Sequence, residues 1–260
     1  MKININKLLI LFCLNICSCQ SQIKNKFHAE VLIIKDSIKC NKEIFFYEFP
    51  DILGKNENNF FNTVIAKDYM NYLDSEKPIL KPIEFVRESI RIKKKNCDNN
   101  NFSGLLNTNC TISFNNFNLL SVIMNYESLA GSSTIETYYY NFDVKNSRML
   151  QYKDVLKEEK VNALIKISDK ILNGRLKDLF NEEKKNLKDS DIYKSLIKSK
   201  NIFKKDNLTS FIIREDGIEF IYNYGFNKGD FDIEDNLFFS FKQIEMFLKD
   251  DFKKNIGWIK

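Results

Sequence analysis

The residues with the most recognisable chemistry in this sequence of 260 residues lie at its N-terminal end. Lys2 and Lys7 precede the apolar run Leu8–Leu14, and the small or polar residues of Cys17–Cys19 follow it. A positive stretch, an apolar stretch and then small residues are typical of an export signal. The apolar run is shorter than the roughly 20 residues that cross a bilayer. We therefore expect residues 1–18 to be a signal peptide that is removed.

The sequence Ile16-Cys17-Ser18-Cys19 resembles a lipobox, in which a small residue precedes the cysteine whose thiol receives a diacylglycerol. Ser18 fits that position, and residues 19–26 read as a polar tether. We expect a lipid on Cys19 and a lipoprotein held at a membrane of the cell envelope, facing the periplasm or the cell exterior. An ordinary secreted protein that is cut near this point is the alternative.

Three further cysteines, Cys40, Cys97 and Cys110, follow the tether. An odd number in an oxidising compartment favours one disulfide and one free thiol. Cys97 and Cys110 bracket the Asn-rich segment 98–109, which reads as a polar turn. Closing so short a loop stabilises the fold by roughly 3 kcal/mol in the chain-entropy model. We expect a Cys97–Cys110 disulfide, while a bond from Cys40 to either partner stays open.

Residues for metal or nucleophilic chemistry are sparse. His28 is the only histidine and no CxxC spacing occurs, so neither a metal site nor a cofactor is expected. The sequence also lacks the GxSxG turn of a serine hydrolase. We name no catalytic residue. The alternative is an envelope hydrolase with two carboxylates, such as Glu127 and Glu136 on neighbouring predicted strands.

A run of three tyrosines is the strongest aromatic feature. Alternation along a strand puts Tyr138 and Tyr140 on one face and Tyr139 on the other. Together with Glu136, the pair Tyr138 and Tyr140 forms a candidate surface for a glycan or a protein. Packing of these rings in the core is the alternative. Asp143 is expected to organise the turn that follows it.

The charge pattern does not favour nucleic acid. The formal net charge of +5 includes two lysines of the expected signal peptide, which leaves about +3 on the mature chain. Short lysine clusters alternate with aspartate and glutamate, a pattern typical of solvated helix faces and loops.

The rest of the pattern alternates between strands and helices. Runs of aromatic and β-branched residues predict strands, and apolar residues at three-and-four spacing predict helices. Strands are expected at 27–35, 43–49, 111–114, 119–126, 134–144, 211–213, 218–222 and 236–241, with the first turn at 36–37. Helices are expected at 58–73, 83–95, 161–180, 190–198 and 242–252. We predict an α+β fold, an antiparallel sheet with helices packed on it, in two closely joined lobes, 27–105 and 106–260.

Several of these segments carry a family resemblance. Phe46–Gly54, the helix that bears Asn62, and the segments Leu119–Tyr126, Tyr139–Lys145 and Leu150–Leu156 resemble the extracellular region shared by RsiV-type anti-sigma factors and PdaC-type deacetylases. The resemblance spans about residues 27 to 252 and implies an α+β fold. The family's Gly-Ala-His type turn is replaced here by Ala-Gly-Ser-Ser. Because RsiV-type proteins sense lysozyme through this region, the resemblance implies a non-enzymatic binding module for a lysozyme-like protein, peptidoglycan or another glycan.

Overall fold

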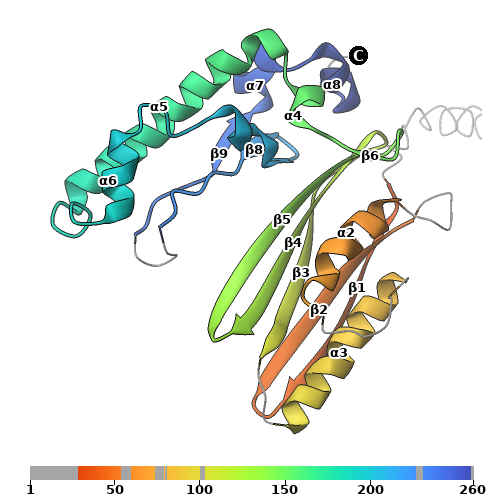
Figure 1. Ribbon diagram of the computed structural model, residues 1–260. Helices are drawn as coiled ribbons and strands as arrows, with labels where there is room; N and C mark the ends of the chain where they lie inside the picture. The colour runs from red at the N-terminus through yellow and green to blue at the C-terminus, as the bar shows by residue number, and fades with distance from the viewer. Residues whose placement is uncertain are drawn as a thin grey trace, which may run out of the picture.

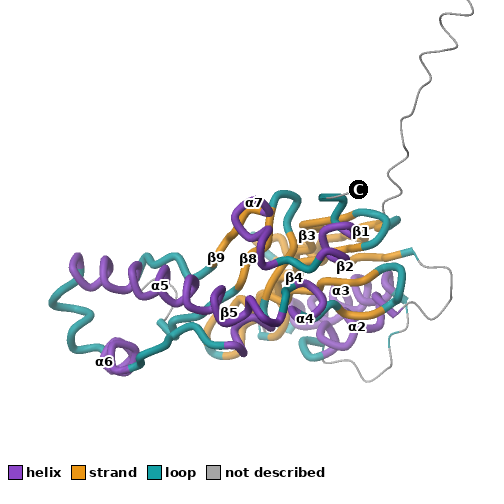
Figure 2. The backbone as a smooth tube through the Cα atoms, turned by 90° about the horizontal axis from the view of Figure 1, so that it is seen from above, coloured by secondary structure: helices purple, strands orange, loops and turns teal. Residues whose placement is uncertain are grey.

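The computed structural model describes residues 29–53, 60–73, 79, 81–99, 103–226 and 231–258. The expected signal peptide, Cys19, the tether and His28 lie outside these residues. The described chain folds into a body of long strands with two helices and an arm that projects from one end of the body (Figures 1 and 2). The mixture of antiparallel sheets and helices confirms the predicted α+β class.

The body begins with a long hairpin of β1 (Val31–Cys40) and β2 (Glu43–Ile52). The chain turns at Asn41, whose φ of 56° lies in the left-handed region that asparagine tolerates. The turn predicted at residues 36–37 is therefore wrong, because Asp36 and Ser37 pair with Tyr47 and Phe46 inside the hairpin. The polar residues Asp36 and Ser37 indicated a turn, but polar residues also occur within β1, because it is an edge strand that exposes most of its side chains to solvent.

Helices α2 (Phe60–Met70) and α3 (Pro82–Asp98) cover one face of the body (Figure 1). Proline suits the first turn of a helix, because the N–H it lacks has no partner there. Asn62 fixes α2 to the end of β2, since its side chain accepts a hydrogen bond from Ile52 N–H at 3.0 Å and donates one to Asp51 at 3.1 Å. The asparagine of the family resemblance thus has a structural role.

Three long strands and one short strand form a meander beside the first hairpin. These are β3 (Gly104–Asn115), β4 (Leu119–Ala130), β5 (Ser132–Asp143) and β6 (Arg148–Met149), in that order across the sheet. Asp143 accepts hydrogen bonds from the backbone and the side chain of Asn146, which confirms its expected role in the β5–β6 turn.

Side chains join the hairpin to the meander. Phe46 N–H donates to Asn107 Oδ1 at 2.8 Å, and Glu48 N–H donates to Thr108 Oγ1 at 2.7 Å. The Thr108 hydroxyl in turn donates to the Glu48 carbonyl at 2.9 Å. Polar side chains of β3 thereby satisfy backbone groups of β2, as a neighbouring strand would. Strands β1 to β5 consequently run side by side (Figure 1).

The C-terminal part supplies the arm and closes one end of the body. It contains α4 (Tyr152–Val155), α5 (Glu158–Glu182), α6 (Asp191–Lys198), η1 (Lys205–Thr209), β7 (Phe211–Ile213), β8 (Gly217–Phe220), β9 (Leu237–Ser240), α7 (Phe241–Ile244), η2 (Glu245–Phe247) and α8 (Asp250–Asn255). The Ser190 side chain accepts from Tyr193 N–H and caps α6, a role that serine commonly takes at the start of a helix. Among the described residues, no helix is long and apolar enough to span a membrane.

The buried apolar residues form two clusters. One joins β1 to β5 with α2 and α3, and the other joins the C-terminal strands and helices with Leu119 at the start of β4. The lobe boundary expected between residues 105 and 106 falls inside β3, whose Leu105 and Cys110 both belong to the first cluster.

A buried amide links the two parts of the fold. Asn141 on β5 donates to the Phe211 carbonyl at 2.7 Å and accepts from Ile213 N–H at 3.1 Å. Its oxygen also accepts from the Ser121 hydroxyl at 2.7 Å. All three bonds are buried, so Asn141 fixes β7 on the meander.

The disulfide joins Cys40 to Cys97, and Cys110 is a buried free cysteine. The predicted Cys97–Cys110 bond is therefore wrong. The segment taken for a polar turn contains the first half of β3, which carries Cys110 away from α3. Cys97, near the end of α3, meets instead the last residue of β1.

Candidate binding face

One face of the sheet formed by β1 to β5 carries no helix among the described residues. Residues directly opposite each other on antiparallel strands share a face. The pairing registers therefore place on this face residues 33, 35, 37 and 39 of β1, 44, 46 and 48 of β2, 107, 109 and 111 of β3, 123, 125 and 127 of β4, and 135, 137 and 139 of β5. We call this set the open face. The opposite face packs against α2 and α3.

The open face combines apolar and polar side chains. Phe46 is 55% exposed, Ile44 52% and Ile135 55%, although the outward face of an antiparallel sheet is ordinarily polar. Between these residues lie hydrogen-bonded polar pairs. Thr137 donates to Asn125 at 2.8 Å, and Asn107 donates to Glu127 at 2.6 Å. An exposed apolar surface interleaved with polar groups is typical of an interaction site.

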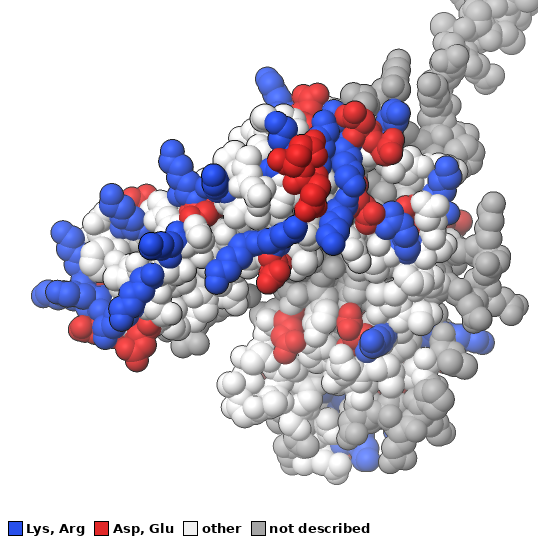
Figure 3. All heavy atoms as spheres, turned by 45° about the horizontal axis from the view of Figure 1, so that its top comes forward, with Lys and Arg blue, Asp and Glu red and all other residues white. Residues whose placement is uncertain are grey.

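The C-terminal part forms a wall at one end of the open face. Arg214 Nε donates to Glu219 Oε2 at 2.6 Å, and Asn236 donates to Glu219 Oε1 at 2.7 Å. Burial raises the pKa of Tyr139, and the nearby carboxylates of Glu219 and Asp235 raise it further. The phenol of Tyr139 is thus neutral at physiological pH and can donate a hydrogen bond. Figure 3 shows that the arm projects from the body and that the space between them is open.

The candidate surface predicted from Glu136, Tyr138 and Tyr140 lies on the opposite face, beside α2. Tyr140 is 3% exposed and donates to Asp68 of α2 at 2.8 Å, so it belongs to the core and is no part of an exposed surface. Tyr138 is half-buried, and Glu136 is exposed at the rim. This face is covered because the apolar stripe of the amphipathic helix α2 packs against it.

The rim of that face holds a hydrogen-bonded cluster of three residues. The Tyr72 hydroxyl donates to Glu136 at 2.6 Å and lies 3.1 Å from the Tyr138 hydroxyl. The Tyr72 ring stacks on the buried Tyr126, with their centroids 4.5 Å apart. Burial and the hydrogen bond to Glu136 raise the pKa of Tyr72. The side chains of this cluster satisfy one another's hydrogen bonds, which favours a structural role for the cluster.

The carboxylate pair required by the hydrolase alternative is not assembled. Glu136 pairs with Tyr126 and so shares the face covered by α2, whereas Glu127 pairs with Ile135 and lies on the open face. Two carboxyl groups on opposite faces of one sheet cannot flank a single glycosidic bond. Nor do the described residues contain a cluster of three or more His, Cys, Asp or Glu side chains able to hold a metal ion.

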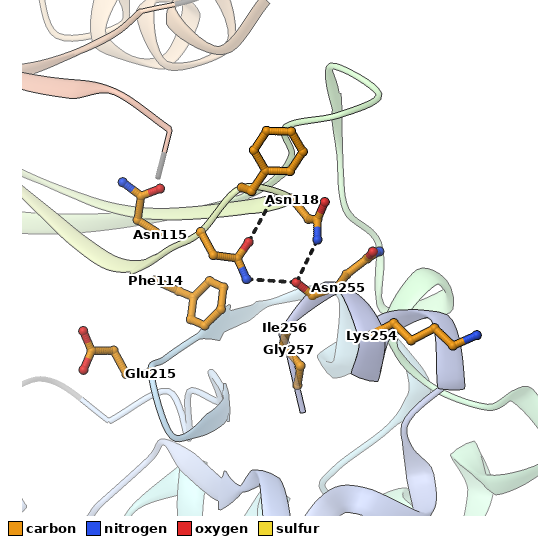
Figure 4. Close-up of a pocket in the computed structure, with 10 residues that line it drawn as sticks. Phe114, Asn115, Asn118, Glu215, Lys254, Asn255, Ile256 and Gly257 are labelled. Atoms are coloured by element: carbon orange, nitrogen blue, oxygen red, sulfur yellow. Dashed lines mark hydrogen bonds between the residues drawn. The ribbon is translucent and has the colours of Figure 1, made fainter. Parts of the chain in front are cut away.

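A pocket of about 510 Å³ lies at the end of the body where the β3–β4 turn meets α8 (Figure 4). Its amides serve the fold. Asn116 and Asn118 both donate to the Asn255 carbonyl, at 2.9 and 3.3 Å. Asn115 exchanges two hydrogen bonds of 2.9 Å with the backbone of Ala29. These three amides are therefore already engaged within the fold.

The comparisons with known proteins bear on the fold. A DUF3298 family protein from Pseudomonas aeruginosa PAO1 superposes with a TM-score of 0.52 at 10% identity, over 89% of this chain and 97% of that one. This chain shares that protein's fold. A member of the DUF3298 family from Bacteroides fragilis NCTC 9343 has a TM-score of 0.46 at 15% identity, over 88% of this chain and 95% of that one. No family model and no curated protein sequence matches the chain.

The sequence contained a signal for the open face that the prediction missed. In β2, both the inward Phe45 and Tyr47 and the outward Ile44 and Phe46 are apolar. A strand with apolar residues on both faces in an antiparallel hairpin indicates that both faces make contacts.

Proposed function

We propose that this chain is a cell-envelope lipoprotein, anchored through Cys19, whose domain is a non-enzymatic binding module for an extracytoplasmic protein. The observation that carries the proposal is the open face, where Phe46, Ile44 and Ile135 are each more than half exposed. Exposed aromatic and aliphatic side chains that no part of the described chain covers are typical of surfaces that bind a partner.

The composition of the open face favours a protein over a glycan. Ile33, Ile44 and Ile135 are exposed aliphatic residues, which suit a protein surface. Its polar groups include the amides of Asn109, which donates to Glu48, and Asn125, which accepts from Thr137. The resemblance to a lysozyme-sensing region supports a protein partner as well.

Loss of Phe46 is expected to weaken capture of the partner. An immobilised fragment of residues 20–260 would be tested with a lysozyme, purified peptidoglycan and an envelope extract. Truncating a central aromatic side chain of an interface costs about 2 kcal/mol or more, so Phe46→Ser should weaken binding by roughly thirtyfold. The measurement is titration of the captured protein against the wild-type and variant fragments.

The matched control for that experiment is Ile197→Ser, because Ile197 is 57% exposed but lies on α6 in the arm. Capture should survive this change. Equal loss in both variants would argue against the open face. Retention of peptidoglycan alone would indicate a glycan partner, and turnover of a cell-wall substrate would contradict the non-enzymatic assignment.

The lipid anchor has its own test. Growth with labelled palmitate should mark the protein, and Cys19→Ala should abolish the label because the acceptor thiol is lost. Cys17→Ala is the matched control and should keep the label, since Ile16 before Cys17 does not fit the small-residue position. Label that persists in Cys19→Ala would contradict the anchor.

A further inference from the structure

The described chain begins at the end of the body that carries the pocket. Ala29 is held there by Asn115, which accepts from Ala29 N–H and donates to the Ala29 carbonyl. Cys19 precedes Ala29 by ten residues, which span at most about 35 Å when fully extended. A lipid on Cys19 would therefore hold this end of the domain close to the bilayer.

The same end exposes two large aromatic side chains. Phe117, in the β3–β4 turn, is 64% exposed and lines the pocket. Trp258 is 43% exposed and directly follows Gly257, another residue of the pocket wall. Tryptophan is enriched where a protein meets the headgroup layer of a membrane, because its ring is apolar while its N–H can still donate.

Some polar groups of the pocket are engaged within the fold, as Figure 4 shows for the Asn118 amide, which donates to the Asn255 carbonyl. The Asn116 Oδ1 accepts from the backbone N–H groups of Asn118 and Leu119, both at 2.8 Å. Beside the charged Glu215 and Lys254, the lining of the pocket includes the apolar side chains of Phe114, Phe117 and Ile256. Apolar side chains beside charged ones suit the boundary between the headgroups and the acyl chains of a bilayer.

We infer that this end of the domain seats on the bilayer surface, with Phe117 and Trp258 at the level of the lipid headgroups. The inference rests on the lipid anchor of the proposed function. Charge contributes little, because Lys253 pairs with Asp250 at 2.8 Å and Lys254 with Asp251 at 4.0 Å. Seating is therefore expected to persist in high salt, unlike attachment through a basic patch.

Seating in this way sets the orientation of the open face. β4 starts beside the Phe117 turn and runs for 12 residues to Ala130. A strand of that length spans about 40 Å. The open face would extend outward from the membrane along this distance, accessible to a partner.

The test uses the fluorescence of Trp258, the only tryptophan in the chain. The processed, lipidated protein would be reconstituted in phosphatidylcholine vesicles, with and without brominated lipid. The emission of Trp258 should shift to shorter wavelength, brominated lipid should quench it and soluble iodide should not. Phe117→Ser should lower the ratio of seated to unseated protein about tenfold, the effect expected for loss of one buried aromatic side chain. The control Ile197→Ser should leave it unchanged.

The outcomes separate this inference from the anchor. If palmitate labelling depends on Cys19 but Trp258 in vesicles stays open to iodide and unquenched by brominated lipid, seating is overturned while the anchor stands. Absence of palmitate label overturns the anchor. Protection of Trp258 that grows with the number of protein copies per vesicle would show that a second copy covers this end, and would overturn seating.

Discussion

Replacing Asn141 with leucine is expected to lower the free energy of unfolding by about 4 kcal/mol, because two backbone groups and a hydroxyl lose their buried partner. The Phe211 carbonyl, the Ile213 N–H and the Ser121 hydroxyl all bond this one amide. Leucine fills a similar volume but can satisfy none of them. Water cannot replace the amide readily, since Ile213 and Ser121 are fully buried.

Urea unfolding monitored by circular dichroism would measure this loss as a lower midpoint. Asn186→Leu is the matched control, because Asn186 is exposed in the loop after α5. That change should stay within about 0.5 kcal/mol of the wild type, as is usual for surface positions. A small effect at Asn141, equal to that of the control, would show that the amide does not join the two parts of the fold.

Removing the Cys40–Cys97 disulfide is the second change with a large expected effect. The bond closes a segment with a sequence separation of 57, so the chain-entropy model assigns it about 4 kcal/mol. The double variant Cys40→Ser and Cys97→Ser should therefore unfold at a markedly lower urea concentration than the oxidised wild type. Reduction of the wild type should produce a similar loss.

Cys110 provides the internal control for the disulfide. Burial, together with the nearby Glu48 carboxylate, raises the pKa of its thiol to about 12. Only about one thiol in 10⁴ is then ionised at pH 8, so Cys110 should resist alkylation until the protein unfolds. Mass spectrometry of the non-reduced, digested protein should find the Cys40 and Cys97 peptides linked. A linked peptide that contains Cys110 would contradict the assignment.

Local features of the fold could be predicted from the sequence because short-range chemistry determines them. Pro82 in the first turn of α3, Ser190 as the cap of α6 and Asp143 in the β5–β6 turn act within a few residues of their own positions. The hairpin after Ile213 follows from Asp216-Gly217 in the same way.

Features that depend on long-range contacts could not be predicted in this way. The alternation of Tyr138, Tyr139 and Tyr140 correctly separates two faces, but it does not say which face a helix covers. Helix α2, some 70 residues earlier in the chain, covers the face of Tyr138 and Tyr140, and its Asp68 accepts a hydrogen bond from Tyr140. The separation of Glu127 from Glu136 follows from the register of β4 on β5.

The sequence by itself thus determined the α+β class, most of the helices and strands, and the local turns and caps, since each depends on neighbouring residues. Only the tertiary structure decided the partner of Cys97, the uncovered face of the sheet and the junction at Asn141. Each of these joins groups that lie far apart in the chain. Their contacts depend on how whole elements pack, and packing follows from burying one continuous apolar surface, not from any single segment.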